Sequence, residues 1–277
     1  MRFAFVTCVQ IGLSCIEEIY NLGFDLKLII TLKEDKGVKK SGRIFIDDFC
    51  KKNNIELLKV ESINENICSE KVRSLNIDWL FIIGWSQIAK SVIIDSPNNG
   101  VIGAHPTLLP KGRGRASIPW AILKSLEYTG VTFFKIDEGV DTGKIIAQEI
   151  IRIDEKENAT SLYNKVVAAH VNLIGKLLPN LIKSNIKYQF QDESKASYWP
   201  SRRPEDGEIN LKGSVLEAEK LIRATTKPYP GAYFFRNHKK IIIWKAKLIE
   251  KRDLNIDKGD ILEFSDGYLL VEEMSKI

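Results

Sequence analysis

The sequence predicts an α/β fold in which a doubly wound, mostly parallel sheet is followed by a small β-rich C-terminal domain. Over residues 1–150, short apolar stretches alternate with amphipathic ones, which is the pattern of repeated strand and helix units. The stretch WLFIIG at residues 79–84 has no polar face, as a parallel strand covered by helices on both sides requires. From Tyr188 onward, Pro and Gly separate short apolar runs, which indicates short strands. We therefore expect one domain over residues 1–190 and a second over residues 191–277.

Apolar periodicity places the individual elements. Short apolar runs predict strands at residues 2–7, 26–31, 55–60, 79–84, 100–104, 130–136 and 144–153. Apolar residues at helical spacing predict helices at residues 11–22, 44–50, 66–75, 116–126, 160–178 and 214–224. We expect Thr160 or Ser161 to cap the long helix and Pro179 to end it. Ligands of a doubly wound sheet bind at the carboxyl ends of its strands, here where Gly84 and Ala104 end two of them.

Composition excludes several classes of protein. The chain has 277 residues, 44% of them hydrophobic and 28% charged, which is typical of a folded globular protein and not of a disordered or fibrous one. No apolar run approaches the roughly 20 residues of a membrane helix, and the N-terminal segment lacks a signal-peptide cleavage site, so we expect a cytoplasmic protein without a membrane partner. The net charge of +5 suits an anionic small molecule better than nucleic acid. Cys8, Cys15, Cys50 and Cys68 lack metal-ligand spacing, so we expect reduced, mostly buried thiols and no metal.

Two ionisable residues are candidates for acid–base chemistry. His105 falls where a buried strand ends, and an imidazole there can exchange protons near neutral pH. Asp141 lies in an acidic, glycine-bearing loop, KIDEGVDTG, between two extended segments. A carboxylate that reaches an imidazole nitrogen fixes its tautomer and stabilises its charged form. The alternatives are a structural histidine at a strand end and a hairpin loop with solvated carboxylates. His170 and His238 have no partner motif, and we interpret both as structural or solvated.

A basic loop follows His105. Lys111, Arg113 and Arg115 in PKGRGR could grip phosphate or carboxylate, although a basic triplet is more often solvated surface. The glycine-rich turn of dinucleotide-binding enzymes is absent after the first strand, which disfavours a nicotinamide oxidoreductase.

Two linked motifs carry a family resemblance. HPTLLPKGRGRASIPWAI at residues 105–122 and TGVTFFKIDEGVDTGKIIAQ at residues 129–148 resemble formyltransferases that use 10-formyltetrahydrofolate. The resemblance is closest to nucleotide-linked amino-sugar N-formyltransferases, and it extends to SRRPEDGEI and IRATTKPYPGAYF in the C-terminal part. It implies a Rossmann-like catalytic domain, 10-formyltetrahydrofolate as co-substrate, and His105 with Asp141 as the catalytic pair.

The resemblance also implies binding residues. The segments that would line the pterin comprise Trp85, Ser86, Gln87, Ile88, Asp137, Glu138, Gly139 and Val140. Independently of the resemblance, the basic loop with Lys111, Arg113 and Arg115 and the polar, aromatic segment with Tyr198, Trp199 and Arg202 could bind the nucleotide sugar. One position departs from the family, which has asparagine two residues before the histidine where this chain has Gly103. Glycine offers no amide to an oxyanion, so we expect another donor, with Gln87 and Ser86 as candidates and Asn98 and Asn99 as further ones.

The reaction implied is transfer of a formyl group from 10-formyltetrahydrofolate to the amine of a nucleotide-linked amino sugar, as in the biosynthesis of lipopolysaccharide or other bacterial surface glycans. The alternatives are a methionyl-tRNA formyltransferase and a relative that binds folate or nucleotide sugar without catalysis. The apolar segment KKIIIWKAKL at residues 239–248, if exposed, could pack against a second copy in a homodimer.

Overall fold

The computed structural model describes residues 1–37, 42–251 and 260–276, and its chain divides into two compact units. The first unit comprises Met1–Gly114, Thr129–Ile151 and Lys165–Tyr198, and the second comprises Arg115–Tyr128, Arg152–Asn164 and Trp199–Ile277. The predicted boundary after residue 190 treats each domain as one continuous stretch. The second unit differs from that scheme because it also takes in two segments from before residue 190, Arg115–Tyr128 and Arg152–Asn164.

The first unit is built on a seven-stranded sheet with the order β3-β2-β1-β4-β5-β7-β8. Its strands are β1 (Arg2–Val6), β2 (Asp25–Leu32), β3 (Glu56–Val60), β4 (Trp79–Ile82), β5 (Gly100–His105), β7 (Tyr128–Lys135) and β8 (Ile145–Arg152). The first five are mutually parallel, and β7 runs antiparallel to β5. The prediction of a doubly wound, mostly parallel sheet is confirmed.

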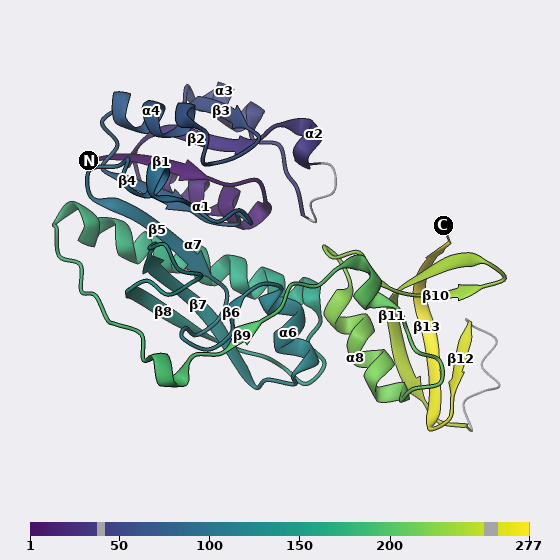
Figure 1. Cartoon of the computed structure of the whole chain (residues 1–277). Helices are drawn as coiled ribbons and strands as arrows, with labels where there is room; N and C mark the ends of the chain where they lie inside the picture. Colours follow the sequence, from purple (N-terminus) through teal and green to yellow (C-terminus); the bar gives the residue numbers. More distant parts are fainter. Residues whose placement is uncertain (38–41, 252–259, 277) are drawn as a thin grey trace. The chain divides into compact units, whose positions relative to one another are not determined.

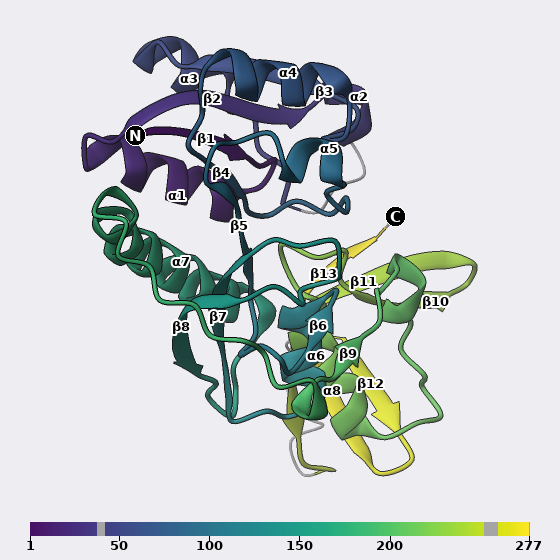
Figure 2. The same ribbon diagram turned by 60° about the vertical axis from the view of Figure 1, so that its left-hand side comes forward.

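Helices cover both faces of this sheet. They are α1 (Gln10–Asn21), α2 (Glu34–Gly37), α3 (Asp47–Asn53), α4 (Asn66–Ser74), α5 (Ser91–Ile94) and α7 (Ala159–Ile182). Figures 1 and 2 show α3 and α4 on one face, with α1 and α7 on the other. None of the helices in the described ranges is long and apolar enough to cross a bilayer.

Alternation along β1 shows how the sheet is sealed. Phe3 and Phe5 both stack on Phe81 of β4 on one face. Ala4 and Val6 point to the opposite face, where they join the buried cluster that includes α4. Burying each of the larger side chains, Phe3, Phe5 and Val6, stabilises the fold by about 2 kcal/mol. The four cysteines are free and buried, as the sequence predicts.

The long helix α7 differs from its prediction at both ends. Pro179 lies inside the helix, which continues to Ile182, so the expected break there is wrong. A proline in the last turn removes one backbone hydrogen bond, and the buried side chains of Leu178 and Leu181 hold that turn in place. At the N-terminus, the cap is Asn158, whose carboxamide oxygen accepts from the Ser161 backbone N–H at 3.0 Å.

The second unit contains a four-stranded antiparallel sheet with the order β10-β11-β13-β12. These strands are β10 (Ala232–Arg236), β11 (Lys239–Ile249), β12 (Ile261–Phe264) and β13 (Gly267–Lys276). Helix α8 (Val215–Thr225) packs on this sheet and also against α6 (Ser117–Leu123). The prediction of a β-rich C-terminal part is confirmed.

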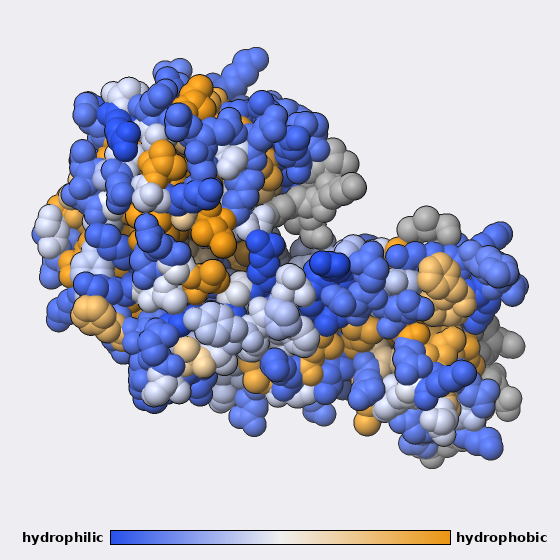
Figure 3. Space-filling model, viewed as in Figure 1, coloured by the Kyte–Doolittle hydropathy of each residue, from blue (hydrophilic) through white to orange (hydrophobic). Residues whose placement is uncertain are grey.

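The middle of the segment at residues 239–248, which could offer a dimer surface if exposed, is instead part of the core of the second unit. Ile241, Ile242 and Ile243 of β11 are all buried, and two of them lie in the cluster that contains Phe234 and Ile222. The sequence alone does not reveal that neighbouring strands and helix α8 cover this apolar run. On the face shown in Figure 3, hydrophilic side chains predominate and apolar ones lie singly or in small groups between them.

Candidate active site

His105 is the last residue of β5, at the carboxyl edge of the parallel sheet. Its side chain is buried, and its Nε2 lies 2.8 Å from the backbone oxygen of Gly112. A carbonyl can only accept, so this contact requires a proton on Nε2. The ring is thereby held by the loop that follows the strand.

Asp141 reaches the other side of the same ring. Its Oδ2 lies 3.5 Å from His105 Nδ1 and also accepts a hydrogen bond from the Gly114 backbone N–H at 2.8 Å. The Asp141 backbone has a φ of 56°, in the left-handed region, where the loop turns back toward β8. The two residues singled out in the sequence therefore meet in the structure. Both ring nitrogens face oxygen acceptors, an arrangement suited to an imidazole that gains a proton during a reaction.

Arg113 does not serve as the ligand-gripping residue that the sequence suggests. Its side chain is fully buried, and its five N–H groups all point to protein acceptors. Nε and Nη2 donate to Gln191 Oε1 at 3.2 and 2.8 Å, and Nη1 donates to Tyr198 Oη at 2.8 Å. Nη1 and Nη2 also donate to the two carboxylate oxygens of Glu193 at 2.8 and 2.6 Å. The substrate-binding role predicted for Arg113 is therefore corrected to an internal one.

The ionic contact between Arg113 and Glu193 affects both groups. The hydrogen bonds to the Glu193 carboxylate raise the pKa of the guanidinium, and the same bonds lower the pKa of Glu193. Arg113 thus stays charged at every accessible pH.

Gln191 was not identified in the sequence, although it links this arginine to the loop of Asp141. While its Oε1 accepts from Arg113, its Nε2 donates to the backbone oxygens of Asp141 at 2.8 Å and of Gly143 at 2.7 Å. No local pattern marks such a residue, since it lies 78 positions from Arg113 and 50 from Asp141 along the chain.

The position of Gly103 is closed by apolar side chains. A Cβ placed on Gly103 would lie 2.9 Å from Ile136 Cγ1 and 3.1 Å from Phe134 Cζ. Residues 103 and 105 point to the same face of β5, because side chains alternate along a strand. Ile136 and Phe134 therefore occupy the space that a side chain at residue 103 would need in order to reach the histidine.

Three of the four replacement donors proposed from the sequence are engaged elsewhere or lie far away. The carboxamide of Gln87 accepts from Ile63 N–H at 3.0 Å and donates to the Glu61 backbone oxygen at 2.8 Å, which argues against the oxyanion role predicted for it. Asn98 and Asn99 precede β5 and bond to Ile77 and Asp78 just before β4, at the opposite edge of the sheet from His105. They cannot serve at the histidine. Ser86 is exposed just beyond β4.

The segments expected to line a pterin leave apolar side chains on the surface. Ile88 is 56% exposed and Val140 is 43% exposed, while Asp137, Glu138 and Gly139 are also exposed. The indole N–H of Trp85 is buried and has no hydrogen-bond partner among the described residues. Because β4 and β5 are parallel neighbours, the chain after β4 lies at the same sheet edge as His105.

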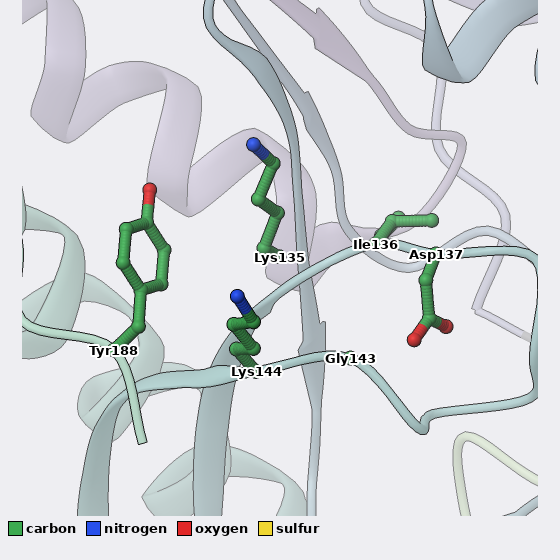
Figure 4. Close-up of a pocket in the computed structure, with 6 residues that line it drawn as sticks. All are labelled: Lys135, Ile136, Asp137, Gly143, Lys144 and Tyr188. Carbon is green, nitrogen blue, oxygen red and sulfur yellow. The ribbon is translucent and has the colours of Figure 1, made fainter. Parts of the chain in front are cut away.

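A cavity of about 310 Å³ adjoins the start of the Asp141 loop. It is lined by Lys135, Ile136, Asp137, Gly143, Lys144 and Tyr188. Figure 4 shows the side chains of Lys135, Lys144 and Tyr188 pointing to one side and that of Asp137 to the other. The Asp137 carboxylate is occupied within its own loop, where it accepts from Gly139 N–H and Thr142 Oγ1.

The other predicted substrate residues are divided between the two units. Lys111 is exposed, and Tyr198 is 59% exposed beneath the guanidinium of Arg113, which lies 5.5 Å from its ring centre. Arg115, Trp199 and Arg202 belong to the second unit. There the Arg115 backbone N–H bonds to the Trp199 oxygen, and Arg202 stacks on Trp120 at 5.2 Å. The nucleotide-sugar role of these residues stays a prediction.

His170 of α7 is a buried structural residue, as predicted. Its Nδ1 lies 2.7 Å from the Val166 backbone oxygen, and its ring meets Phe133 edge-on. Burial lowers the pKa of His170 to about 4, so the ring is neutral at physiological pH. His238, at the tip between β10 and β11, is exposed. Within the described ranges, no group of three or more His, Cys, Asp or Glu is placed to hold a metal ion.

Comparison with known proteins agrees with this geometry. Residues 25–178 match the formyl transferase family and residues 202–275 match the formyl transferase C-terminal domain. The methionyl-tRNA formyltransferase of Agathobacter rectalis is 31% identical over 91% of this chain and 82% of its own length. The bifunctional polymyxin resistance protein ArnA of Wigglesworthia glossinidia brevipalpis is 34% identical over 89% of this chain, which covers 37% of that protein.

Among solved structures, the fold is similar to the N-formyltransferase from Helicobacter canadensis in complex with folinic acid and dTDP-3-aminofucose. The TM-score is 0.72 at 22% identity, over 99% of each chain. The two family matches together span most of the chain. The chain therefore belongs to the formyl transferase family.

Proposed function

We propose that this protein is an N-formyltransferase that moves a formyl group from 10-formyltetrahydrofolate to the amine of a nucleotide-linked amino sugar. The observation that carries the proposal is the position of His105, buried at the carboxyl edge of the sheet with Asp141 on one ring nitrogen. Membership of the formyl transferase family supplies the class of reaction.

The reaction assigned to this site is an acyl transfer. The neutral amine attacks the formyl carbon, the carbonyl becomes a tetrahedral oxyanion, and the bond from that carbon to N10 of the folate breaks. Because Nε2 already carries the proton directed at Gly112, His105 takes the proton that the attacking nitrogen loses at Nδ1, and that proton is returned to N10 as the folate leaves. Asp141 stabilises the imidazolium formed between these steps. Much of the remaining rate comes from holding both substrates in one orientation.

The residues present suit a flat aromatic co-substrate. Ile88 and Val140 offer exposed apolar surface in the two segments assigned to the pterin. The unpartnered indole N–H of Trp85 is a donor that burial makes costly to leave unsatisfied. A folate covering these segments would bury the two aliphatic side chains.

Charge supports a small acceptor over a tRNA. Residues 199–277 carry 15 Lys and Arg against 13 Asp and Glu, a net charge of +2. A protein that grips RNA through many phosphate contacts needs a larger basic excess. The Helicobacter canadensis enzyme, which carries a nucleotide-linked amino sugar, has a chain of the same extent.

The test is incubation of the purified protein with 10-formyltetrahydrofolate and, in parallel, dTDP- and UDP-linked amino sugars and methionyl-tRNA. Mass spectrometry should detect the gain of one formyl group on a nucleotide-linked amino sugar. Formylation of methionyl-tRNA alone would assign the chain to the activity for which its Agathobacter rectalis relative is named.

Gly103 favours a second candidate, a protein that binds folate or nucleotide sugar without turnover. The position that would carry an oxyanion-stabilising amide is closed by Ile136 and Phe134. Removing one such donor costs about 3 to 4 kcal/mol of transition-state stabilisation in other enzymes. Saturable binding of both ligands by calorimetry, without any formylated product, would establish this second function.

A further inference from the structure

We propose that Arg113 and Gln191 are positioning residues. Together they fix the loop after β5 and the Asp141 loop, between β7 and β8, in place beside His105. This inference rests on the proposed function for its kinetic consequence, but its structural part does not. The residues lie behind the reactive pair and touch it only through backbone groups.

The loop after β5 is held at Arg113 and contacts the reactive pair at the residues on either side. Gly112 supplies the oxygen at His105 Nε2, and Gly114 supplies the N–H at Asp141 Oδ2. Arg113 lies between them on the short strand β6 (Arg113–Gly114), and its side chain is buried in the protein. Any shift of Arg113 therefore moves both backbone contacts at once.

The buried guanidinium is satisfied by acceptors of the protein. An arginine with 0% exposure loses its hydration, so each N–H that lacks an acceptor is costly. The acceptors of Gln191, Glu193 and Tyr198 together take all five N–H groups. A planar fork bound at five points fixes the position of its backbone.

Gln191 carries this constraint to the second loop. Its carboxamide makes four hydrogen bonds, two accepted from Arg113 and two donated to the backbone oxygens of Asp141 and Gly143. The amide orientation follows from its partners, because Arg113 can only donate and carbonyls can only accept. Gln191 thus joins the backbone of Asp141 to the loop that contacts His105.

A glutamate at position 191 separates the two halves of this arrangement. It has almost the same shape and would pair with Arg113, but it has no N–H for the Asp141 and Gly143 oxygens and would place negative charge against them. Gln191→Glu should therefore release the Asp141 loop while Arg113 stays bound. Gln189→Glu is the matched control, since it makes the same chemical change two residues away on an exposed side chain.

The experiment combines ¹⁵N NMR of the histidine rings with steady-state kinetics on the full chain. The His105 signals are assigned by their loss in His105→Asn. Gln191→Glu should shift the ¹⁵N resonances of the His105 ring and lower kcat about 10- to 100-fold with little change in KM, whereas Gln189→Glu should match the wild type in both readouts. Unaltered His105 resonances and kcat in Gln191→Glu, or equal changes in the control, would overturn the proposal.

Two further outcomes are separable. If Gln191→Glu melts below the assay temperature, the same comparison is made with Arg113→Lys, which keeps the charge but loses the fork, and unaltered His105 resonances there would overturn the proposal. If the wild type transfers no formyl group but the His105 resonances shift in Gln191→Glu, the proposed function fails and the positioning role stands.

Discussion

The two flanks of His105 are built from opposite chemistry. On the loop side, Gly112 and Asp141 present oxygens to the ring, and Arg113 with Gln191 fixes the backbone behind them. On the strand side, the neighbouring position that faces the same way is glycine, and Ile136 fills the space beside it. The contrast teaches that the loop side brings a histidine and a carboxylate together, as the proposed proton transfer requires, whereas the strand side offers no side chain at position 103.

The largest effect should come from the loop side. His105→Asn removes the group that accepts the proton, and kcat for formyl transfer should fall about 10²- to 10⁴-fold. The measurement is product formation by mass spectrometry, with the melting temperature as the control for folding. Equal turnover in the variant and the wild type would remove His105 from the reaction.

Asp141→Asn sharpens the same comparison. The amide oxygen can still accept from Gly114 N–H, but the negative charge 3.5 Å from the ring is lost. A charge-assisted contact contributes about 1.5 to 3 kcal/mol, so kcat should fall about 10- to 100-fold with little change in KM. If Asp141→Asn retains full activity, the carboxylate only holds the Gly114 backbone N–H and plays no part in the reaction.

The strand side is tested by restoring the amide. Gly103→Asn forces Ile136 and Phe134 to move, and overpacking of this kind should lower the free energy of unfolding by about 1 to 3 kcal/mol in chemical denaturation. Adding Ile136→Ala opens that space, so the double variant should recover stability relative to Gly103→Asn and should exceed Ile136→Ala in kcat. A single Gly103→Asn variant as stable as the wild type would show that Ile136 and Phe134 move aside without cost.

The smallest effect concerns the histidine that takes no part in the chemistry. Burial lowers the pKa of His170 to about 4, so the unfolded chain binds a proton at this residue between about pH 6.5 and 4 while the folded chain does not. The free energy of unfolding therefore keeps its full value at this residue above pH 6.5. It falls as the pH falls below 6.5, by up to about 3 kcal/mol at pH 4. Urea unfolding across this range should show a gentler acid loss in His170→Leu than in the wild type; identical slopes would contradict the account.

Much of the fold could be predicted because it depends on short-range patterns. The strand WLFIIG and the alternation of strands and helices predict a sheet with ligands at the carboxyl edge, and His105 stands at that edge. The prolonged helix past Pro179 could not be predicted, since tertiary burial of Leu178 and Leu181 overrides the local signal.

The site could be predicted only in part for a related reason. Residue type indicates that Arg113 can bind an anion, but not whether that anion is a ligand or, as here, Glu193 of the same chain. Gln191 carries no sequence signal because its partners are set by long-range topology. The amide of Gln87, a candidate oxyanion donor, likewise bonds to Glu61 and Ile63 just after β3, which the sequence could not indicate.

The most direct measurement follows a ¹³C-labelled formyl carbon from 10-formyltetrahydrofolate in the wild type and in His105→Asn side by side. The account predicts that the label appears on the nitrogen of a nucleotide-linked amino sugar with the wild type and at a rate at least about 100-fold lower with the variant. Label that stays on the folate with the wild type across dTDP- and UDP-linked amino sugars, or that moves equally fast with both proteins, would contradict it.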